Sequence, residues 1–397
     1  MPKTKPSLLQ DLKHTYDGLK PNPIRVFDAE ANSIEGVVKL TLGEPDFNVP
    51  EHIKQAAIDS INNDESHYGP SNGWPRLQTA AAGFLKDRYD LDYEPQSEIV
   101  VTVGATEALH SCLDALLNPG DKVLMPSPTF SLYDQLIRIN GGIPVYINTA
   151  ATGFVLTPEQ LEEAIATEGD HVKAILLNFP SNPTGVTYSK AQVDAIAKVV
   201  AKTDIAVISD EIYSELTYGS VHASFAKALP EQTLLINGVS KSHAMTGWRI
   251  GFIAGPADLM RRVGLAHAFN VTVASNPAMA GAIEALSTEA GREDSQQMKA
   301  EYLKRRDYVV GEMTKMGFSI PEPNGAFYVF AKIPAGCIQD DTEFCYDLLR
   351  KNKLALIAGG GFGPGGEAHV RVSYAASMAT LQEAMKRLGA YVAENKQ

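Results

Sequence analysis

The sequence contains few cysteines and lacks long apolar runs. Its 397 residues include only three cysteines, Cys112, Cys337 and Cys345, and no two of them are spaced as in a Cys-x-x-Cys pair. So small and odd a number argues against structural disulfides and indicates a reducing compartment. No apolar stretch reaches the roughly 18 residues of a membrane helix, and no apolar segment follows the N-terminal lysines as in a signal peptide. We therefore expect a soluble, cytoplasmic protein.

Basic residues are in the minority. Lys and Arg number 35 against 47 Asp and Glu, which gives a formal net charge of −12. So acidic a chain is a poor general ligand for nucleic acid or an anionic membrane, and we expect neither as a partner. Hydrophobic residues make up 44% of the chain, which is ordinary for a globular protein with a large core. The length exceeds that of one ordinary domain and predicts two.

The middle of the chain alternates short apolar runs with longer amphipathic segments. The apolar runs are continuous, as expected for strands that are covered by helices on both faces of a sheet. Strand and helix in turn therefore predict an α/β fold with a mostly parallel sheet. The predicted strands are 99–103, 122–125, 174–178, 205–209, 233–237 and 250–254, and the predicted helices are 107–117, 130–140 and 190–202.

The last part of the chain has a different character and predicts a smaller α+β domain. Its predicted elements are a long helix at 297–315, strands around a turn at 323–325, a helix at 341–351, a strand at 369–374 and a closing helix. The first 45 or so residues are too few to stand alone, so we expect them to pack on this part. The predicted division is a large domain at 46–290 and a small domain formed by 1–45 and 291–397.

Polar motifs follow two of the predicted strands at the point where each strand ends. Asp210 follows the strand at 205–209, and Asn182 lies in an Asn-Pro-Thr-Gly segment after the strand at 174–178. Taken alone, Asp210 fits a helix cap and the second segment fits a simple turn. Both lie at carboxyl ends of parallel strands, where such sheets bind ligands. Tyr213, three residues after Asp210, can share a face with it.

Three basic positions and one small-residue turn suggest an anionic ligand. A lysine is far more often a solvated surface group than a catalytic one, but Lys241 lies among small residues, and a desolvated amine suits a Schiff base. Arg249 nearby suits a phosphate, as do the backbone N–H groups of Gly104-Ala105-Thr106 at a predicted helix start. Arg371 lies in an apolar strand, where a buried arginine needs an anionic partner from the protein or from a ligand.

One ligand accounts for all these groups together: pyridoxal 5′-phosphate, which needs a lysine, a carboxylate, a phosphate site and polar donors. With these residues in place, the sequence resembles the fold-type I pyridoxal-phosphate aminotransferases of class I and II, in the branch with bacterial aromatic-amino-acid and N-acetyl-diaminopimelate aminotransferases. The matching motifs occur in family order and span most of the chain. They are TLGEPDF (41–47), HYGPSNGWPRL (67–77), TVGATEAL (102–109), PSPTF (126–130), NFPSNPTG (178–185), ISDEIYSEL (208–216), NGVSKSHAMTGWRIGF (237–252), NGAFYVF (324–330) and VRVSYA (370–375).

The resemblance implies a role for each candidate residue. Lys241 would form the internal aldimine and then act as general acid and base, while Asp210 would keep the pyridine nitrogen protonated. Tyr213 and Asn182 would hydrogen-bond the O3′ oxygen of the cofactor. Further cofactor contacts would come from Ala105, Thr106, Ser240 and Arg249 at the phosphate and from Phe130 on the ring. The substrate α-carboxylate would be bound by Arg371 with Asn182 and Gly43.

The resemblance also implies an architecture and an assembly. The large domain would hold a seven-stranded, mostly parallel sheet flanked by helices, beside the smaller α+β domain. In the family, the tyrosine at the position of Tyr68 reaches the phosphate from the neighbouring subunit, which implies a homodimer with shared active sites. The prolines Pro128 and Pro183 lie in cofactor-contacting loops, and the resemblance predicts cis peptides before both. No metal is implied.

The function implied is an aminotransferase of amino-acid metabolism. It would move an amino group from an aromatic amino acid, N-acetyl-diaminopimelate or a similar donor to 2-oxoglutarate. A strict aspartate aminotransferase would need a second arginine from the partner subunit, and the segment at 268–277 has no basic residue. The alternatives are an aspartate aminotransferase, a C–S lyase or a cyclising synthase on the same fold. A regulator built on this fold would need a DNA-binding module, for which the chain has no spare segment.

Overall fold

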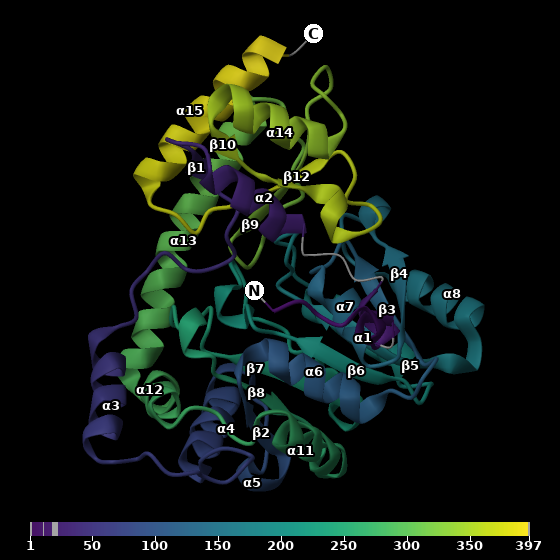
Figure 1. Cartoon of the computed structure of the whole chain (residues 1–397), viewed down its shortest axis with the longest axis vertical. Coiled ribbons are helices and arrows are strands. Elements are labelled where there is room, and N and C mark those ends of the chain that lie inside the picture. The colour runs from purple at the N-terminus through teal and green to yellow at the C-terminus, as the bar shows by residue number, and fades with distance from the viewer. Residues whose placement is uncertain (1, 11, 18–22, 396–397) are drawn as a thin grey trace.

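A computed structural model describes residues 2–10, 12–17 and 23–395 of the chain. Its main element is a seven-stranded sheet with the strand order β2-β8-β7-β6-β5-β3-β4 (Figure 1). β8 runs antiparallel to both neighbours, whereas the other neighbouring strands are parallel. The α/β fold predicted from the sequence is thereby confirmed. The strands are β2 (Ile99–Thr102), β3 (Lys122–Ser127), β4 (Ile143–Asn148), β5 (Val172–Asn178), β6 (Ala206–Asp210), β7 (Thr233–Gly238) and β8 (Gly251–Ala254).

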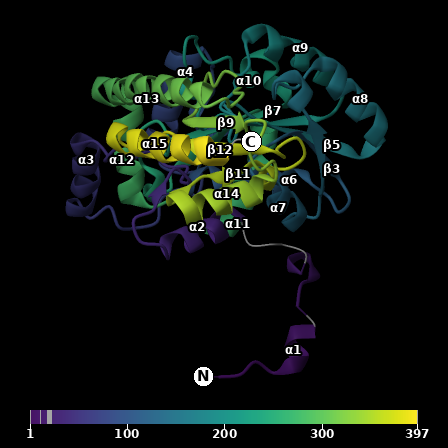
Figure 2. The ribbon, with the colours of Figure 1, turned by 90° about the horizontal axis from the view of Figure 1, so that it is seen from above.

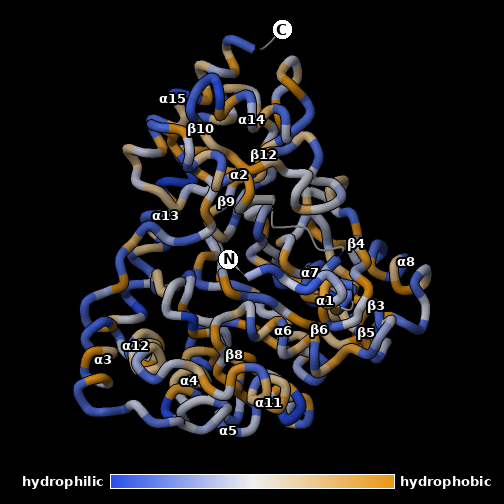
Figure 3. Tube along the Cα trace, in the orientation of Figure 1, coloured by the Kyte–Doolittle hydropathy of each residue, from blue (hydrophilic) through white to orange (hydrophobic). Residues whose placement is uncertain are grey.

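Helices cover both faces of this sheet, because successive strand side chains point to opposite faces and both sets are buried. One set packs on α6 (Gly104–Leu116), α7 (Leu132–Ile139) and α11 (Ala257–Val271). The other set packs on α4 (Pro75–Tyr89), α8 (Pro158–Glu168), α9 (Lys190–Val200), α10 (Phe225–Ala228) and α12 (Asn276–Ser287). Figure 3 shows this as hydrophobic strands within outer helices of mixed hydropathy. The continuous apolar runs of the sequence are thus explained by burial on two sides.

A smaller antiparallel sheet, in the order β11-β12-β9, occupies the upper part of Figure 1. A short parallel pair, β1 with β10, joins the N-terminal segment to this part. The elements here are α2 (Pro23–Asn32), β1 (Val38–Lys39), β9 (Tyr328–Lys332), α14 (Asp341–Asn352), β10 (Leu354–Ala355), β11 (Ile357–Ala358), β12 (His369–Ser373) and α15 (Met378–Asn395). The division into domains at 46–290 and at 1–45 with 291–397 stays a prediction.

The long helix α13 (Glu289–Lys315) extends from the large sheet to the smaller one (Figure 1). It begins well before the predicted residue 297, because the Thr288 side chain accepts a hydrogen bond from the Gly291 N–H and caps the helix. Gly291 permits a close approach to α12, since a Cβ there would lie 2.2 Å from the Ala285 carbonyl oxygen. Beside this junction, His52 of α3 (Glu51–Asn62) contacts two carboxylates, Glu284 at 2.8 Å and Asp294 at 2.7 Å.

Two further differences from the sequence prediction concern strands. β4 was missed; it is an edge strand that contains Pro144, and its burial is irregular rather than continuous. Of the strands expected around residues 323–325, only β9 forms, while Ser319 and Gly325 make isolated bridges. In the described part of the chain, no helix is long and apolar enough to cross a membrane. The remaining helices are α1 (Pro6–Gln10), which projects from the body in Figure 2, and α5 (Pro95–Glu98).

Candidate active site

A cavity of about 540 Å³ lies beyond the carboxyl ends of the parallel strands. The carboxyl ends of β5, β6 and β7 lie at the same edge of the sheet because these strands run in the same direction. Asn178 is paired in register with Asp210, and Asp210 with Ile236. All but one of the predicted site residues line this cavity, and the exception is Tyr68. The residues brought together are Gly43, Ala105, Thr106, Phe130, Asn182, Asp210, Tyr213, Ser240, Lys241, Arg249 and Arg371.

Asp210 ends β6 and is almost completely buried, with 3% of its surface exposed. The Tyr133 hydroxyl donates a hydrogen bond to Oδ2 at 2.7 Å, and the Ile212 N–H donates to Oδ1 at 3.2 Å. No lysine or arginine of the described chain forms an ion pair with it. Burial therefore dominates and raises the pKa of Asp210 to about 6. The site holds a carboxylate that lacks a cationic partner.

Lys241 follows β7 and directs its amine into the same cavity. Its Nζ donates a hydrogen bond to the Gly43 carbonyl oxygen at 2.6 Å. Burial lowers the pKa of Lys241 to about 8, and the positive charge of Arg249 adds to this effect. A substantial fraction of this amine is therefore neutral near physiological pH, which is the form that attacks a carbonyl carbon.

Tyr213 and Tyr328 form a buried pair beside the amine. Their hydroxyl oxygens lie 2.8 Å apart, and the Lys241 Nζ lies 5.7 Å from the centre of the Tyr213 ring. Burial raises the pKa of both phenols, so both are neutral and each can donate or accept a hydrogen bond. Sequence reasoning did not single out Tyr328, although it lies in the NGAFYVF motif.

Arg371 is 2% exposed and lies on β12 of the smaller sheet, yet it reaches the cavity. Its Nη1 donates to the Asn182 Oδ1 at 2.9 Å, and its Nη2 donates to the Thr41 carbonyl oxygen at 2.6 Å. No carboxylate of the described residues pairs with it, and its buried Nε has no hydrogen-bond partner there. Of the two partners that the sequence left open, the protein's own carboxylates are therefore excluded within the described chain.

The N-terminus of α6 and Arg249 enclose a second part of the cavity. Gly104 has a positive φ of 75°, and a Cβ on it would lie 2.5 Å from the Nη2 of Arg249. The guanidinium therefore sits directly over the first turn of α6, where Ala105 and Thr106 present unpaired backbone N–H groups. The Nη1 of Arg249 donates to the Thr246 carbonyl oxygen at 3.0 Å, which fixes its orientation. A helix N-terminus with an arginine is suited to a phosphate.

Three outcomes concern the remaining sequence predictions. Tyr68 lies outside the cavity with 88% of its surface exposed, in a separate surface hollow that Asn276 also lines. The cis peptides before Pro128 and Pro183 are confirmed, and a third, before Pro180, was not expected. Tyr133 was missed as well, because a tyrosine in an amphipathic helix is typical of core packing and its contact with Asp210 spans 77 positions.

Comparison with known proteins places this site in a family context. The sequence matches the family described as aminotransferase class I and II over residues 35–388. It is 40% identical over 374 residues to a probable N-acetyl-LL-diaminopimelate aminotransferase of Bacillus subtilis, covering 94% of each chain. It is also 40% identical over 365 residues to an aspartate aminotransferase of Geobacillus stearothermophilus, covering 89% of this chain and 90% of that one. The solved structure of Thermus thermophilus aspartate aminotransferase with maleate superimposes with a TM-score of 0.90 at 34% identity, covering 96% of this chain and 99% of that one.

Proposed function

The chain belongs to the class I and II aminotransferases, and from this membership we propose which residues carry the reaction and which amino acids it uses. The protein is an enzyme that transfers amino groups and depends on pyridoxal phosphate. The convergence in one cavity of a buried amine, Lys241, and a buried carboxylate without a cation, Asp210, carries the proposal. Their pKa values are shifted toward each other, which is typical of functional groups.

The residues of the cavity fit the cofactor. The Asp210 carboxylate would accept a hydrogen bond from the protonated ring nitrogen, which would supply the cation that the described chain lacks. The first turn of α6 with Thr106, Ser240 and Arg249 would hold the phosphate. Tyr213 and Asn182 would donate to O3′, and Phe130 would stack on the ring. When bound, pyridoxal phosphate supplies an aldehyde for the amino group and a ring that stabilises negative charge at the substrate Cα.

Lys241 would act on protons at the substrate. Its Nζ, with a pKa of about 8, would take the proton from the substrate Cα as a general base. The same Nζ would return that proton to the carbon on the other side of the transferred nitrogen, so one group would carry out both proton transfers. The carbonyl oxygen of Gly43 holds Nζ at 2.6 Å and limits its movement to this region.

Arg371 would bind the α-carboxylate of every substrate. The motivating observation is its Nε, which is buried without a partner among the described residues, while both other nitrogens are held in place. A carboxylate beside Nε would satisfy this donor and supply the missing negative charge. Since amino donors and oxo-acid acceptors all carry this group, one arginine would serve both half-reactions.

The proposed donors are aromatic amino acids, N-acetyl-diaminopimelate or similar long amino acids, with 2-oxoglutarate as acceptor. Among the described residues of the chain, the cavity is lined by three basic side chains, Lys241, Arg249 and Arg371, and each already has an assigned task. No further cation among the described lining residues is therefore available to fix a second carboxylate. The Bacillus relative named for N-acetyl-LL-diaminopimelate supports this choice, whereas the Geobacillus relative favours aspartate.

Steady-state kinetics with 2-oxoglutarate would test the donor assignment. Phenylalanine, N-acetyl-diaminopimelate and aspartate are compared by kcat/KM, and we expect at least one of the first two to equal or exceed aspartate. A value for aspartate more than about a hundredfold above both others, near 3 kcal/mol of preferential transition-state binding, would show a dedicated dicarboxylate site. Donor alone should convert the bound cofactor to its aminated form, whereas a C–S lyase or cyclising synthase would release product without that conversion.

We propose further that the enzyme is a homodimer with shared active sites. Tyr68 and Phe269 are each 88% exposed, and their segments adjoin because His267 and Asn276 bond the backbone at Ser71 and His67. Exposed aromatic rings on adjoining segments favour a protein interface. Light scattering should give twice the chain mass of 42.8 kDa. Tyr68→Phe should weaken cofactor binding if its hydroxyl reaches the partner's phosphate; an unchanged affinity would contradict that contact.

A further inference from the structure

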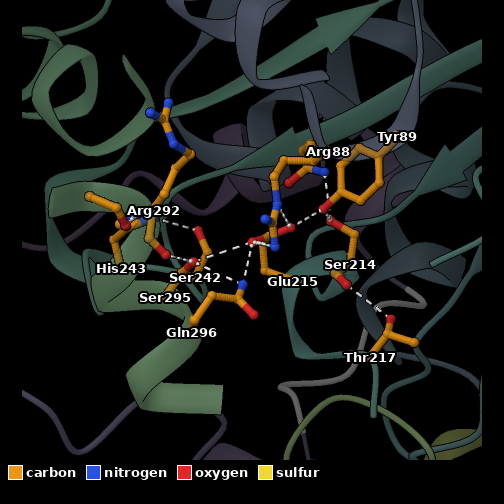
Figure 4. Close-up of polar contacts among 12 residues, drawn as sticks. Arg88, Tyr89, Ser214, Glu215, Thr217, Ser242, His243, Arg292, Ser295 and Gln296 are labelled. Atoms are coloured by element: carbon orange, nitrogen blue, oxygen red, sulfur yellow. Dashed lines mark hydrogen bonds and ion pairs between the residues drawn. The ribbon is translucent and has the colours of Figure 1, made fainter. Parts of the chain in front are cut away.

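A second polar cluster lies outside the active-site cavity, and its side chains come from the end of α4, the 3-10 helix at Ser214–Leu216 and α13 (Figure 4). Its centre is Glu215, whose side chain is 5% exposed. The Glu215 carboxylate accepts hydrogen bonds from Tyr89 at 2.6 Å, from Ser295 at 3.2 Å and from Gln296 at 3.2 Å. Arg88 pairs with it at 2.9 Å, so this carboxylate is fully satisfied. The cluster also encloses a cavity of about 230 Å³.

The cavity carries an excess of positive charge. Arg88 and Glu215 neutralise each other, but Lys299 lines the same space and has no hydrogen bond or ion pair among the described residues. It lies on α13 and is about half buried, and this burial lowers the pKa of Lys299. The Glu215 carboxylate attracts this ammonium without pairing with it directly, and the net effect still disfavours the charge. A partly desolvated ammonium without an ion pair is costly, and a bound anion would reduce that cost.

His222 lines the same cavity and has an unused ring nitrogen. Its side chain is 1% exposed, and its Nε2 contacts the buried carboxylate of Glu211 at 2.7 Å. Glu211 also accepts hydrogen bonds from Ser209, Ser224 and the Phe225 N–H, which hold that carboxylate in place. The Nδ1 of His222 is buried with no partner among the described residues. Buried polar atoms are normally hydrogen-bonded, so this nitrogen indicates a missing group.

We propose that this cavity binds one small oxyanion, either inorganic phosphate or the carboxylate of a small organic acid. Lys299 would supply the positive charge that is not neutralised within the cavity, and the Nδ1–H of His222 would supply a directed hydrogen bond. Because Nε2 already faces Glu211, Nδ1 carries a hydrogen only in the doubly protonated ring, so the anion would bind the His222 cation. The site is separate from the active-site cavity, since the two share no lining residue in the described chain.

The site adjoins the active-site strand through the chain itself. Glu211 directly follows Asp210, and Glu215 lies two residues after Tyr213. The 3-10 helix at Ser214–Leu216 is thus held on one side by the polar cluster around Glu215, while Tyr213 faces the cofactor cavity. A bound anion would therefore hold the segments of Glu211 and Glu215 in place on the side that faces away from the cofactor cavity.

Calorimetric titration of the cofactor-loaded enzyme with inorganic phosphate, and separately with acetate, would test the proposal. Constant ionic strength is maintained with chloride, and bound cofactor keeps phosphate out of the phosphate pocket at α6. The variant is Lys299→Met, with Lys299→Gln as a second variant in case the first is unstable. The matched control is Lys304→Met on the same helix, where the lysine is 72% exposed and pairs with Glu301 at the surface.

We expect one Lys299-dependent site for phosphate or acetate per chain in the wild type and in Lys304→Met, with affinity at that site at least tenfold weaker in Lys299→Met and Lys299→Gln. Acetate held by Arg371 would bind equally in all four proteins. The anion that binds more tightly shows whether the natural ligand is a phosphate or a carboxylate. In ¹⁵N-histidine spectra, the His222 Nδ1 signal, assigned by its loss in His222→Gln, should move to the protonated position on binding. No binding, or binding unaffected by both Lys299 variants, would overturn the proposal and show that the cavity holds water only or that anions bind elsewhere.

Discussion

Replacing Asp210 by asparagine should stabilise the cofactor-free protein, although it removes a catalytic group. The pKa of Asp210 is raised by burial from 3.8 to about 6, so the folded state holds a proton that the unfolded state has lost between these values. Stability therefore falls as the pH rises from about 4 to about 6, and it stays low above that range. Near neutral pH, the raised pKa of Asp210 lowers the free energy of unfolding by about 3 kcal/mol. A neutral side chain of the same shape avoids this cost.

The gain is reduced by one hydrogen bond. Asparagine has one oxygen, so it can accept from Tyr133 or from the Ile212 N–H but not from both, which costs about 1 kcal/mol. We therefore expect Asp210→Asn to raise the free energy of unfolding by about 1–2 kcal/mol at about pH 8 and to lower it slightly at about pH 4. With the cofactor bound, the sign should reverse, because the ring nitrogen then supplies the positive partner of the carboxylate.

Urea unfolding of the cofactor-free protein at both pH values, at one fixed protein concentration, measures the effect. Asp258→Asn is a matched control, since that carboxylate is 91% exposed and should give no pH-dependent gain. The reasoning would be refuted if Asp210→Asn were less stable than the wild type by the same amount at both pH values. It would also fail if the cofactor stabilised both proteins equally.

Three further predictions concern other groups. Lys241→Ala should keep its fold, measured by circular dichroism, and lose nearly all turnover; a rate within about tenfold of the wild type, about 1.4 kcal/mol, would contradict the assignment. Asp210→Ala should lower kcat by several orders of magnitude and by more than Tyr213→Phe, because the phenol only tunes a charge that the carboxylate holds; equal losses would count against that ranking. Burial opposes protonation of His52, but its hydrogen bonds to the two flanking carboxylates outweigh it and raise its pKa. His52→Gln should therefore cost most stability below about pH 6.5 and progressively less as the pH rises through the raised value, and an equal cost in thermal unfolding at about pH 5.5 and pH 8.5 would disprove this.

The sequence located the centre of the site because its residues follow strands that are buried on both faces. Asp210 is the last residue of one such strand and Lys241 follows another within a few residues, so the apolar runs indicated at which edge of the sheet both would lie. Tyr133 and Tyr328 were not readable in this way. Their hydroxyls meet Asp210 and Tyr213 across 77 and 115 positions, and nothing local distinguishes them from other core aromatics.

Element boundaries failed where a local signal conflicted with packing. α13 starts before the predicted residue 297, because the Thr288 side chain caps it and Gly291 permits the close approach of α12. Pro144 hid β4, since a proline is tolerated only where the strand has an unpaired edge. The edge position of β4 depends on strands that are remote in sequence, so a single sequence does not reveal it, whereas Thr288 and Ala285 lie close to Gly291 in the chain.

The contacts of Arg371 have a consequence for how substitutions there are interpreted. Its guanidinium joins the backbone at Thr41, the side chain of Asn182 and the aromatic rings of Tyr328 and Phe362, so it connects chain segments from both sheets. Any replacement removes these connections together with the carboxylate site. Lysine keeps the charge, but its three donors share one nitrogen, so it cannot span the separate acceptors at Thr41, at Asn182 and on a carboxylate as the planar guanidinium does. A loss of substrate affinity at this position therefore combines recognition with assembly of the cavity, and a chain that tolerates no change there is constrained by both.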